Sequence, residues 1–235
     1  MSTGTIILIA VSLLMVGLII AATAYSRTVG IINKYKDMDC KINARAIDFA
    51  AKCIEVFNLN IKIALTDKEL GDAYVPNKKI LVISKQMADS RSISAISVVS
   101  HEIGHAIQDK NKKVLLKLDI FFRKLYSFFK FLIFPIFISG IILLFFPEYE
   151  LVGLILLISL LGIWVLSIIT RLITIPMEYE ASKIAYNMLK DNRVLTRAEL
   201  KITKKILKAA ALTYVAALFI NVLNLLRRIK YSFRS

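Results

Sequence analysis

Four long apolar runs constrain this 235-residue chain more than any other feature of its sequence. They cover residues 6–24, 125–146, 151–170 and 209–226. A helix needs about 20 mostly apolar residues to cross the hydrocarbon core of a bilayer. The chain is 57% hydrophobic, with a mean hydropathy of +0.65, whereas soluble domains are typically about 45–50% apolar. We therefore predict an α-rich integral membrane protein with three or four transmembrane helices.

The first and last runs allow alternatives. Residues 6–24 could be a cleaved signal peptide, but no Lys or Arg precedes them and the run is longer than a typical signal-peptide core, which favours a retained anchor. The last run carries Thr213, Asn221 and Asn224 roughly along one face. It could span the membrane beside other helices or pack against the soluble part.

The charge distribution predicts the topology, because Lys and Arg concentrate on the cytoplasmic side of membrane proteins. The segments after the first and third runs are basic, and the link 147–150 carries only acidic charge. The basic tail after Leu226 would lie outside if the fourth run spans, against this rule. The predicted parts are an N-terminal transmembrane anchor (1–26), a small α+β zincin-like cytoplasmic part (27–124), a transmembrane hairpin (125–170), a cytoplasmic helical part (171–208), and a fourth hydrophobic helix with its basic tail (209–235).

The net charge of +15 fits cytoplasmic segments that lie against anionic lipid. No nucleic-acid-binding motif is present, so we expect the lipid bilayer, and not nucleic acid, as the partner of these charges. Cys40 and Cys53 lack the spacing of a metal site. We expect Cys53 in the core and both thiols reduced.

Residues 27–124 show helix and strand patterns. A helix over 41–57 capped by Asp39 is predicted, then strands over 61–65 and 80–84 separated by a loop with Gly71 and Pro76. A further helix begins after Ser90 or Ser92 as N-cap. Its expected buried side is Ile93, Ile96, Val99 and Ile103.

The only two histidines of the chain lie on this helix, in the sequence His101-Glu102-Ile103-Gly104-His105. Residues four apart share one helix face, so both imidazoles can bind one Zn²⁺. Glu102 can then take a proton from a water on the metal and pass it to the leaving amine. The alternative is a pair of structural histidines beside a surface glutamate. The helical context and the slim Gly104 favour a metal site.

Catalytic zinc needs a third protein ligand, and no third histidine exists. The best candidate is Glu178 in the stretch IPMEYEASKIA, where Pro176 suits the first turn of a new helix. Glu178 shares a face with the small residues Ala181, Ser182 and Ala185, which would allow a close approach to the histidine helix, while Glu180 would point roughly to the other side. Alternatively, Glu178 only stabilises the positive end of its helix.

Several stretches resemble the YugP-like membrane-bound neutral zinc metallopeptidases. They are SISAISVVSHEIGHAIQD (92–109), DAYVPNKKILVIS, PMEYEAS and AAALTYVAAL, and the resemblance covers about residues 40–226. The chain also resembles the gluzincin membrane proteases. That resemblance implies His101, His105 and Glu178 as zinc ligands and Glu102 as the base. Those enzymes have aspartate where this chain has Ser182, and that aspartate would orient a ligand histidine. Here Ser182 is a weaker candidate for this role, and the alternative is that another group takes it.

An oxyanion stabiliser is also expected, and Tyr74, Tyr179 and Tyr186 are the candidates. The strand 80–84 could be a sheet edge that binds an extended peptide, or an ordinary buried strand.

The favoured function is a membrane-embedded zinc metalloendopeptidase with one Zn²⁺ per chain. It would hydrolyse polypeptides, membrane proteins among them, at the cytoplasmic face of the cell membrane. The alternatives are a metal-stabilised membrane scaffold, an intramembrane site-2-type protease and a transporter. Charged residues on both sides of His101 argue against the site-2 type. The scarcity of ionisable groups in the second and third runs argues against a transporter.

Overall fold

The computed structural model describes residues 19, 22–68 and 71–209. Within them the chain forms two compact units, one of residues 117–174 and one that combines residues 22–116 with 175–209. The expectations for the first and fourth apolar runs concern residues that lie almost wholly outside this described part.

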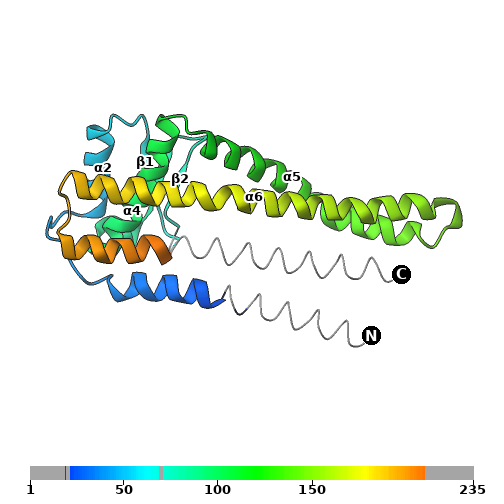
Figure 1. Ribbon diagram of the computed structural model, residues 1–235, viewed down its shortest axis with the longest axis horizontal. Coiled ribbons are helices and arrows are strands. Elements are labelled where there is room, and N and C mark those ends of the chain that lie inside the picture. Colours follow the sequence, from blue (N-terminus) through cyan, green and yellow to red (C-terminus); the bar gives the residue numbers. More distant parts are fainter. Residues whose placement is uncertain (1–18, 20–21, 69–70, 210–235) are drawn as a thin grey trace. The chain divides into compact units, whose positions relative to one another are not determined.

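The unit 117–174 is a helical hairpin (Figure 1). Helix α5 (Val114–Leu143) is joined through the short 3₁₀ helix η1 (Pro147–Tyr149) to helix α6 (Glu150–Asp191). Both α5 and α6 are long and apolar enough to cross a membrane. The hairpin exposes large apolar side chains such as Phe131 and Phe145, as expected of a surface solvated by lipid.

Two glycines let the hairpin helices approach closely. A Cβ atom built on Gly153 would lie 2.8 Å from the carbonyl oxygen of Gly140, and one built on Gly140 would lie 2.8 Å from Leu157 Cδ2. Small residues at such crossings are typical of helix pairs in membranes. At the end of the unit near residues 117 and 174, the buried carboxylate of Asp119 joins the two helices. It accepts hydrogen bonds from Thr174 Oγ1 (2.6 Å) and from Arg123.

The second unit contains a three-stranded sheet with the order β1-β3-β2. Strand β1 (Lys62–Thr66) pairs in parallel with β3 (Ile80–Ser84), and β2 (Ala73–Val75) pairs antiparallel with β3. The alternative that strand 80–84 forms a sheet edge is therefore wrong. It is the central strand, and Leu81 and Ile83 are fully buried. The strand β2 at the edge was not predicted.

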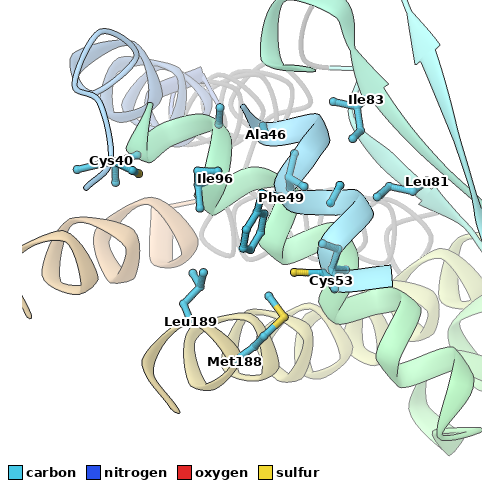
Figure 2. Packing of buried hydrophobic residues seen from close by; sticks show 14 of the residues in the cluster. Cys40, Ala46, Phe49, Cys53, Leu81, Ile83, Ile96, Met188 and Leu189 are labelled. Atoms are coloured by element: carbon cyan, nitrogen blue, oxygen red, sulfur yellow. The ribbon is translucent and has the colours of Figure 1, made fainter. Parts of the chain in front are cut away.

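Helices α2 (Ala46–Val56), α3 (Lys85–Asp89) and α4 (Ile93–Lys110) pack with the sheet and the end of α6 around one apolar core (Figure 2). The predicted start of α2 at residue 41 is wrong. Asp39 instead forms a β-bridge with Ser92, and a turn closed by the hydrogen bond from Asn43 N–H to the Cys40 carbonyl oxygen precedes the helix. Cys53 lies in the core as expected, and Cys40 is buried as well. Burial raises the pKa of each thiol to about 12, which leaves both unreactive.

The second unit also includes helices over residues 22–34 and 197–209. The latter begins with a capping box, in which Glu199 Oε2 accepts from the backbone N–H of Thr196 (2.7 Å) and the Thr196 hydroxyl accepts from the N–H of Glu199 (3.3 Å). The other oxygen of Glu199 accepts from the N–H of Lys41 at 2.7 Å. This carboxylate therefore ties the start of the last described helix to the segment before α2.

Helix α6 runs without a break through Pro176. The prediction that a new helix starts there is wrong. Proline removes one helical hydrogen bond, but the packing of the helix on both sides of it outweighs that loss. Glu178 consequently lies deep inside a helix that starts at Glu150, so a role in stabilising a helix N-terminus does not apply to it.

Candidate metal centre

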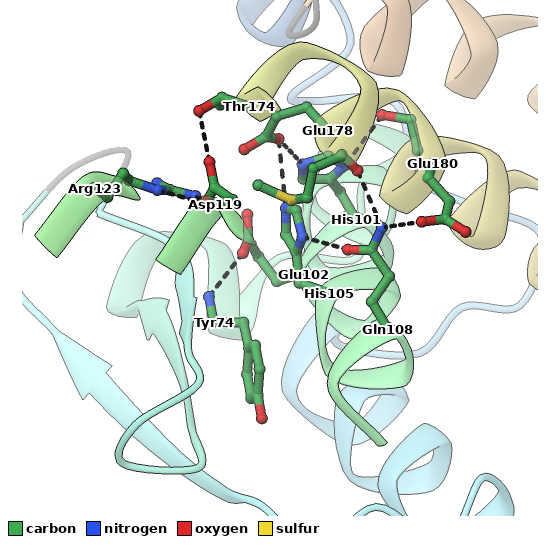
Figure 3. A network of polar contacts seen from close by, with 12 residues as sticks. Tyr74, His101, Glu102, His105, Gln108, Asp119, Arg123, Thr174, Glu178 and Glu180 are labelled. Atoms are coloured by element: carbon green, nitrogen blue, oxygen red, sulfur yellow. Dashed lines mark hydrogen bonds and ion pairs between the residues drawn. The ribbon is translucent and has the colours of Figure 1, made fainter. Parts of the chain in front are cut away.

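Helix α4 presents the two histidines from a rigid position. The Ser92 hydroxyl caps its first turn by accepting from the N–H of Ala95 at 3.1 Å, so the predicted N-cap is confirmed. The predicted apolar side is confirmed too, since Ile93, Ile96, Val99 and Ile103 are at most 1% exposed. One flank of this helix faces the interior, and His101 and His105 project from the neighbouring flank toward α6 (Figure 3).

Helix α6 meets α4 at the glycine between the histidines. A Cβ atom built on Gly104 would lie 2.5 Å from the carbonyl oxygen of Ala181. Ala181 and Ala185 are fully buried on the same side of α6. The absence of a side chain on Gly104 and the small residues opposite it thus set a helix spacing that brings the side chain of Glu178 to the imidazoles.

The structure brings His101, His105 and Glu178 together (Figure 3). Glu178 Oε2 lies 3.0 Å from His101 Nε2 and 3.4 Å from His105 Nε2, and one ligand atom from each residue lies within 4.8 Å of the others. Donors bound to a tetrahedral zinc at its usual bond lengths are about 3.3 Å apart. The arrangement therefore fits a single zinc ion, and two imidazoles with one carboxylate are a donor set found in catalytic zinc sites.

In the metal-free protein these groups stabilise one another electrostatically. Burial alone would raise the pKa of Glu178, but hydrogen bonds with His101 and His105 outweigh it and hold that pKa well below its usual range. Burial likewise acts to lower the pKa of His105, yet the contacts with Glu178 and the charge of Glu102 raise it above its usual value.

The ring nitrogen of each histidine that faces away from Glu178 has its own hydrogen-bond partner. Ser182 Oγ lies 3.2 Å from His101 Nδ1, and Gln108 Oε1 lies 3.0 Å from His105 Nδ1. Ser182 was a candidate for such a contact. Gln108 was missed, although its position three residues after His105 places the two side chains on one helix face. Both contacts leave the Nε2 atoms directed at Glu178.

The side chain of Glu102 extends from α4 toward strand β2 at the edge of the sheet. Its Oε2 atom accepts a hydrogen bond from the backbone N–H of Tyr74 in β2 at 2.7 Å (Figure 3). The short antiparallel strand therefore fixes the carboxylate that immediately follows the first histidine.

The three candidate tyrosines have different surroundings. The Tyr74 hydroxyl donates to Asp109 Oδ2 at 2.5 Å, and burial together with this contact raises the pKa of Tyr74. Tyr179 is 67% exposed. Tyr186 lines a surface pocket with Lys190 and Arg193. Among the contacts described for these side chains, none joins a tyrosine hydroxyl to the cluster of His101, His105 and Glu178.

Comparison with known proteins agrees with this geometry. A family model described as "Putative neutral zinc metallopeptidase" matches residues 8–232, nearly the whole chain. The chain belongs to this family.

A family relative is the "Putative membrane protease YugP" of Bacillus subtilis (strain 168), which is 33% identical over 199 residues that cover 83% of each chain. The predicted resemblance is thereby confirmed. No solved structure matches the chain. The family and this relative's name agree with a zinc peptidase associated with a membrane, and the two apolar helices of the chain could supply the membrane anchorage.

Gly104 provides a direct test of the helix contact that shapes the site. The Gly104→Ala variant places a methyl group against the Ala181 carbonyl oxygen, so we expect it to lose about 1–3 kcal/mol of stability and to bind zinc more weakly. Thermal unfolding and zinc titration of the purified protein measure both effects. Gly30→Ala is the matched control, because a Cβ there meets no atom within 4 Å. An equal response of the two variants would contradict the close contact.

Proposed function

We propose that the protein is a zinc-dependent metalloendopeptidase of the gluzincin type, embedded in the cell membrane. The observation that carries the proposal is the convergence of His101, His105 and Glu178 on one point, directly beside the carboxylate of Glu102. Two of these residues come from α4 and the third from α6, more than seventy positions later. Two imidazoles and one carboxylate are a donor set of catalytic zinc sites, so this convergence favours a metal site over a purely structural cluster.

Each residue has a role in the proposed reaction. His101, His105 and Glu178 would hold one zinc ion per chain, which would supply a Lewis acid to polarise the peptide carbonyl and lower the pKa of water. Glu102 takes a proton from the water that attacks the carbonyl carbon. When the C–N bond breaks, Glu102 delivers that proton to the leaving amine. An extended substrate would lie beside the edge strand β2, which pairs with β3 on its other side.

The number of available ligands favours catalysis over a structural metal site. Structural zinc is usually bound by four protein ligands, whereas catalytic zinc keeps one position open. In the part of the chain that the structure describes, no fourth His, Cys, Asp or Glu joins the cluster. The site-2-type alternative is not favoured either, because α5 and α6 are the described helices that could span a membrane and α4 is not one of them.

Purified protein in detergent tests the function directly. We expect about one zinc ion per chain, cleavage of casein or of an unfolded membrane protein, loss of cleavage on chelation, and recovery with added zinc. Zinc analysis of the same sample accompanies each assay. A zinc-loaded protein that cleaves neither substrate would favour the scaffold alternative, and a protein that binds no zinc would exclude the proposal.

We place the active site on the cytoplasmic face, with substrates that are polypeptides reaching that face. The support is the charge distribution, since the link 147–150 is acidic and the segments on either side of the hairpin are basic. Because both native cysteines are buried, a cysteine introduced at exposed Glu148 should react with a membrane-impermeant maleimide on intact cells, and one at exposed Lys112 should not. The opposite labelling pattern would reverse the orientation.

A further inference from the structure

Gln108 is a fully buried polar side chain that connects the two helices of the metal centre. Its amide nitrogen donates to the backbone carbonyl of Met177 and to Glu180 Oε2, both at 3.1 Å, while its oxygen lies 3.0 Å from His105 Nδ1. The amide therefore uses its acceptor and both of its N–H donors. Glu180 is held in turn by Lys113 Nζ at 3.0 Å.

The partners on α6 determine which way the amide faces. Met177 offers a carbonyl oxygen and Glu180 a carboxylate, so both can only accept hydrogen bonds. A flipped amide would place its oxygen against these two acceptors, and each would lose its donor inside the protein. The Gln108 oxygen must therefore point to His105.

This orientation has a consequence for the imidazole. Facing an oxygen, His105 Nδ1 must carry the hydrogen, because two acceptors cannot bond to each other. When a metal ion lies at Nε2, the neutral ring carries its one hydrogen at Nδ1, and Nε2 offers the lone pair that a metal ligand requires. Nε2 is also the atom that faces Glu178 Oε2.

We propose that Gln108 is the positioning residue of this site. It fixes the tautomer and orientation of His105 and does so only while α6, the helix that carries Glu178, is docked. The orientation of the ligand His105 therefore depends on the packing of the helix that supplies the ligand Glu178. This inference rests on the proposed zinc function, but its first consequence, the tautomer of His105, concerns the protein without metal.

The scarcity of histidine makes the tautomer measurable. Full-length protein carrying a histidine-free affinity tag and labelled with [¹⁵N]histidine contains only two imidazoles, His101 and His105. At alkaline pH, ¹⁵N NMR distinguishes a protonated from an unprotonated ring nitrogen. We expect His105 of the zinc-loaded wild type to be protonated at Nδ1 only. In the metal-free wild type Nε2 faces Glu178, and we expect a larger Nδ1-protonated fraction than in a variant that lacks the Gln108 oxygen.

Gln108→Leu removes all three hydrogen bonds at similar volume. In the metal-free protein we expect a smaller fraction of His105 protonated at Nδ1 than in the wild type, because Nε2 still faces Glu178. We also expect about 10- to 100-fold weaker zinc binding, with the signals of His101 unchanged. Ser182→Ala is the matched control, because it removes the partner of His101 Nδ1 and should alter the His101 signals while leaving those of His105 unchanged.

A second variant keeps the test valid if Gln108→Leu does not fold. Gln108→Glu retains an acceptor for His105 Nδ1 but loses the donors to Met177 and Glu180. It should preserve the tautomer and lower the stability of the metal-free protein. Wild-type affinity together with a wild-type His105 spectrum in Gln108→Leu would overturn the inference while leaving the zinc function intact. Absence of zinc binding in the wild type would instead refute the function, and the metal-free spectra would still decide the role of Gln108.

Discussion

Glu178→Ala is expected to abolish stoichiometric zinc binding. The variant leaves only two imidazoles on α4 to hold the ion, and it removes the single negative charge that the cluster contributes. Removing a hydrogen-bond partner of a metal ligand typically weakens metal affinity about 10- to 100-fold. Removing the ligand itself should weaken zinc affinity by more than that. Zinc content after dialysis and competition with a coloured chelator measure the effect, and cleavage of casein should disappear with the metal.

Two further variants make this result specific. Glu150→Ala removes an exposed carboxylate at the start of the same helix and should retain full zinc content. Glu178→Gln preserves the size of the side chain and should also lose zinc, because a neutral amide is a poor ligand for this ion. If Glu178→Ala retained one zinc ion per chain with wild-type affinity, α6 would not supply the third ligand.

Glu102→Gln is expected to separate metal binding from hydrolysis. The variant should hold zinc as the wild type does, because Glu102 is not a member of the ligand cluster. The glutamine oxygen can still accept from the N–H of Tyr74, so the local structure should persist. Cleavage should fall by at least about 10²- to 10⁴-fold, the usual contribution of a general base.

The comparison requires equal zinc loading of both proteins, measured on the samples used for the assay. Glu55→Gln, which changes an exposed glutamate of α2 paired with Lys52, controls for the loss of one negative charge. Undiminished cleavage by zinc-loaded Glu102→Gln would mean that another group accepts the proton.

Local rules in the sequence were sufficient for much of this centre. The spacing of His101 and His105 follows from helix geometry, and the Ser92 cap and the buried isoleucines of α4 follow from short-range patterns. Strand β3 matches its predicted bounds because its apolar run follows a turn and ends at Ser84, the N-cap position of α3.

The sequence-based predictions fail where contacts between residues far apart in the sequence determine the structure. Proline is typical of the first turn of a helix, yet Pro176 lies inside α6 because contacts along that helix outweigh the preference. Glu180 was expected to face away from α4, but its long side chain reaches Gln108 from the flank of the contact. Strand β2 has only three residues, too few for an alternating pattern, and it exists because β3 offers a free edge beside it.

Because the site is divided between α4 and α6, it cannot form during synthesis until both helices have been made. Ribosomes add about 5–20 residues per second, and 77 positions separate His101 from Glu178. For several seconds a growing chain therefore exposes both imidazoles without the carboxylate. The apolar hairpin of α5 and α6, which is long enough to cross a membrane, lies between them. In the proposed enzyme, a chain arrested before α6 is complete would lack the third zinc ligand.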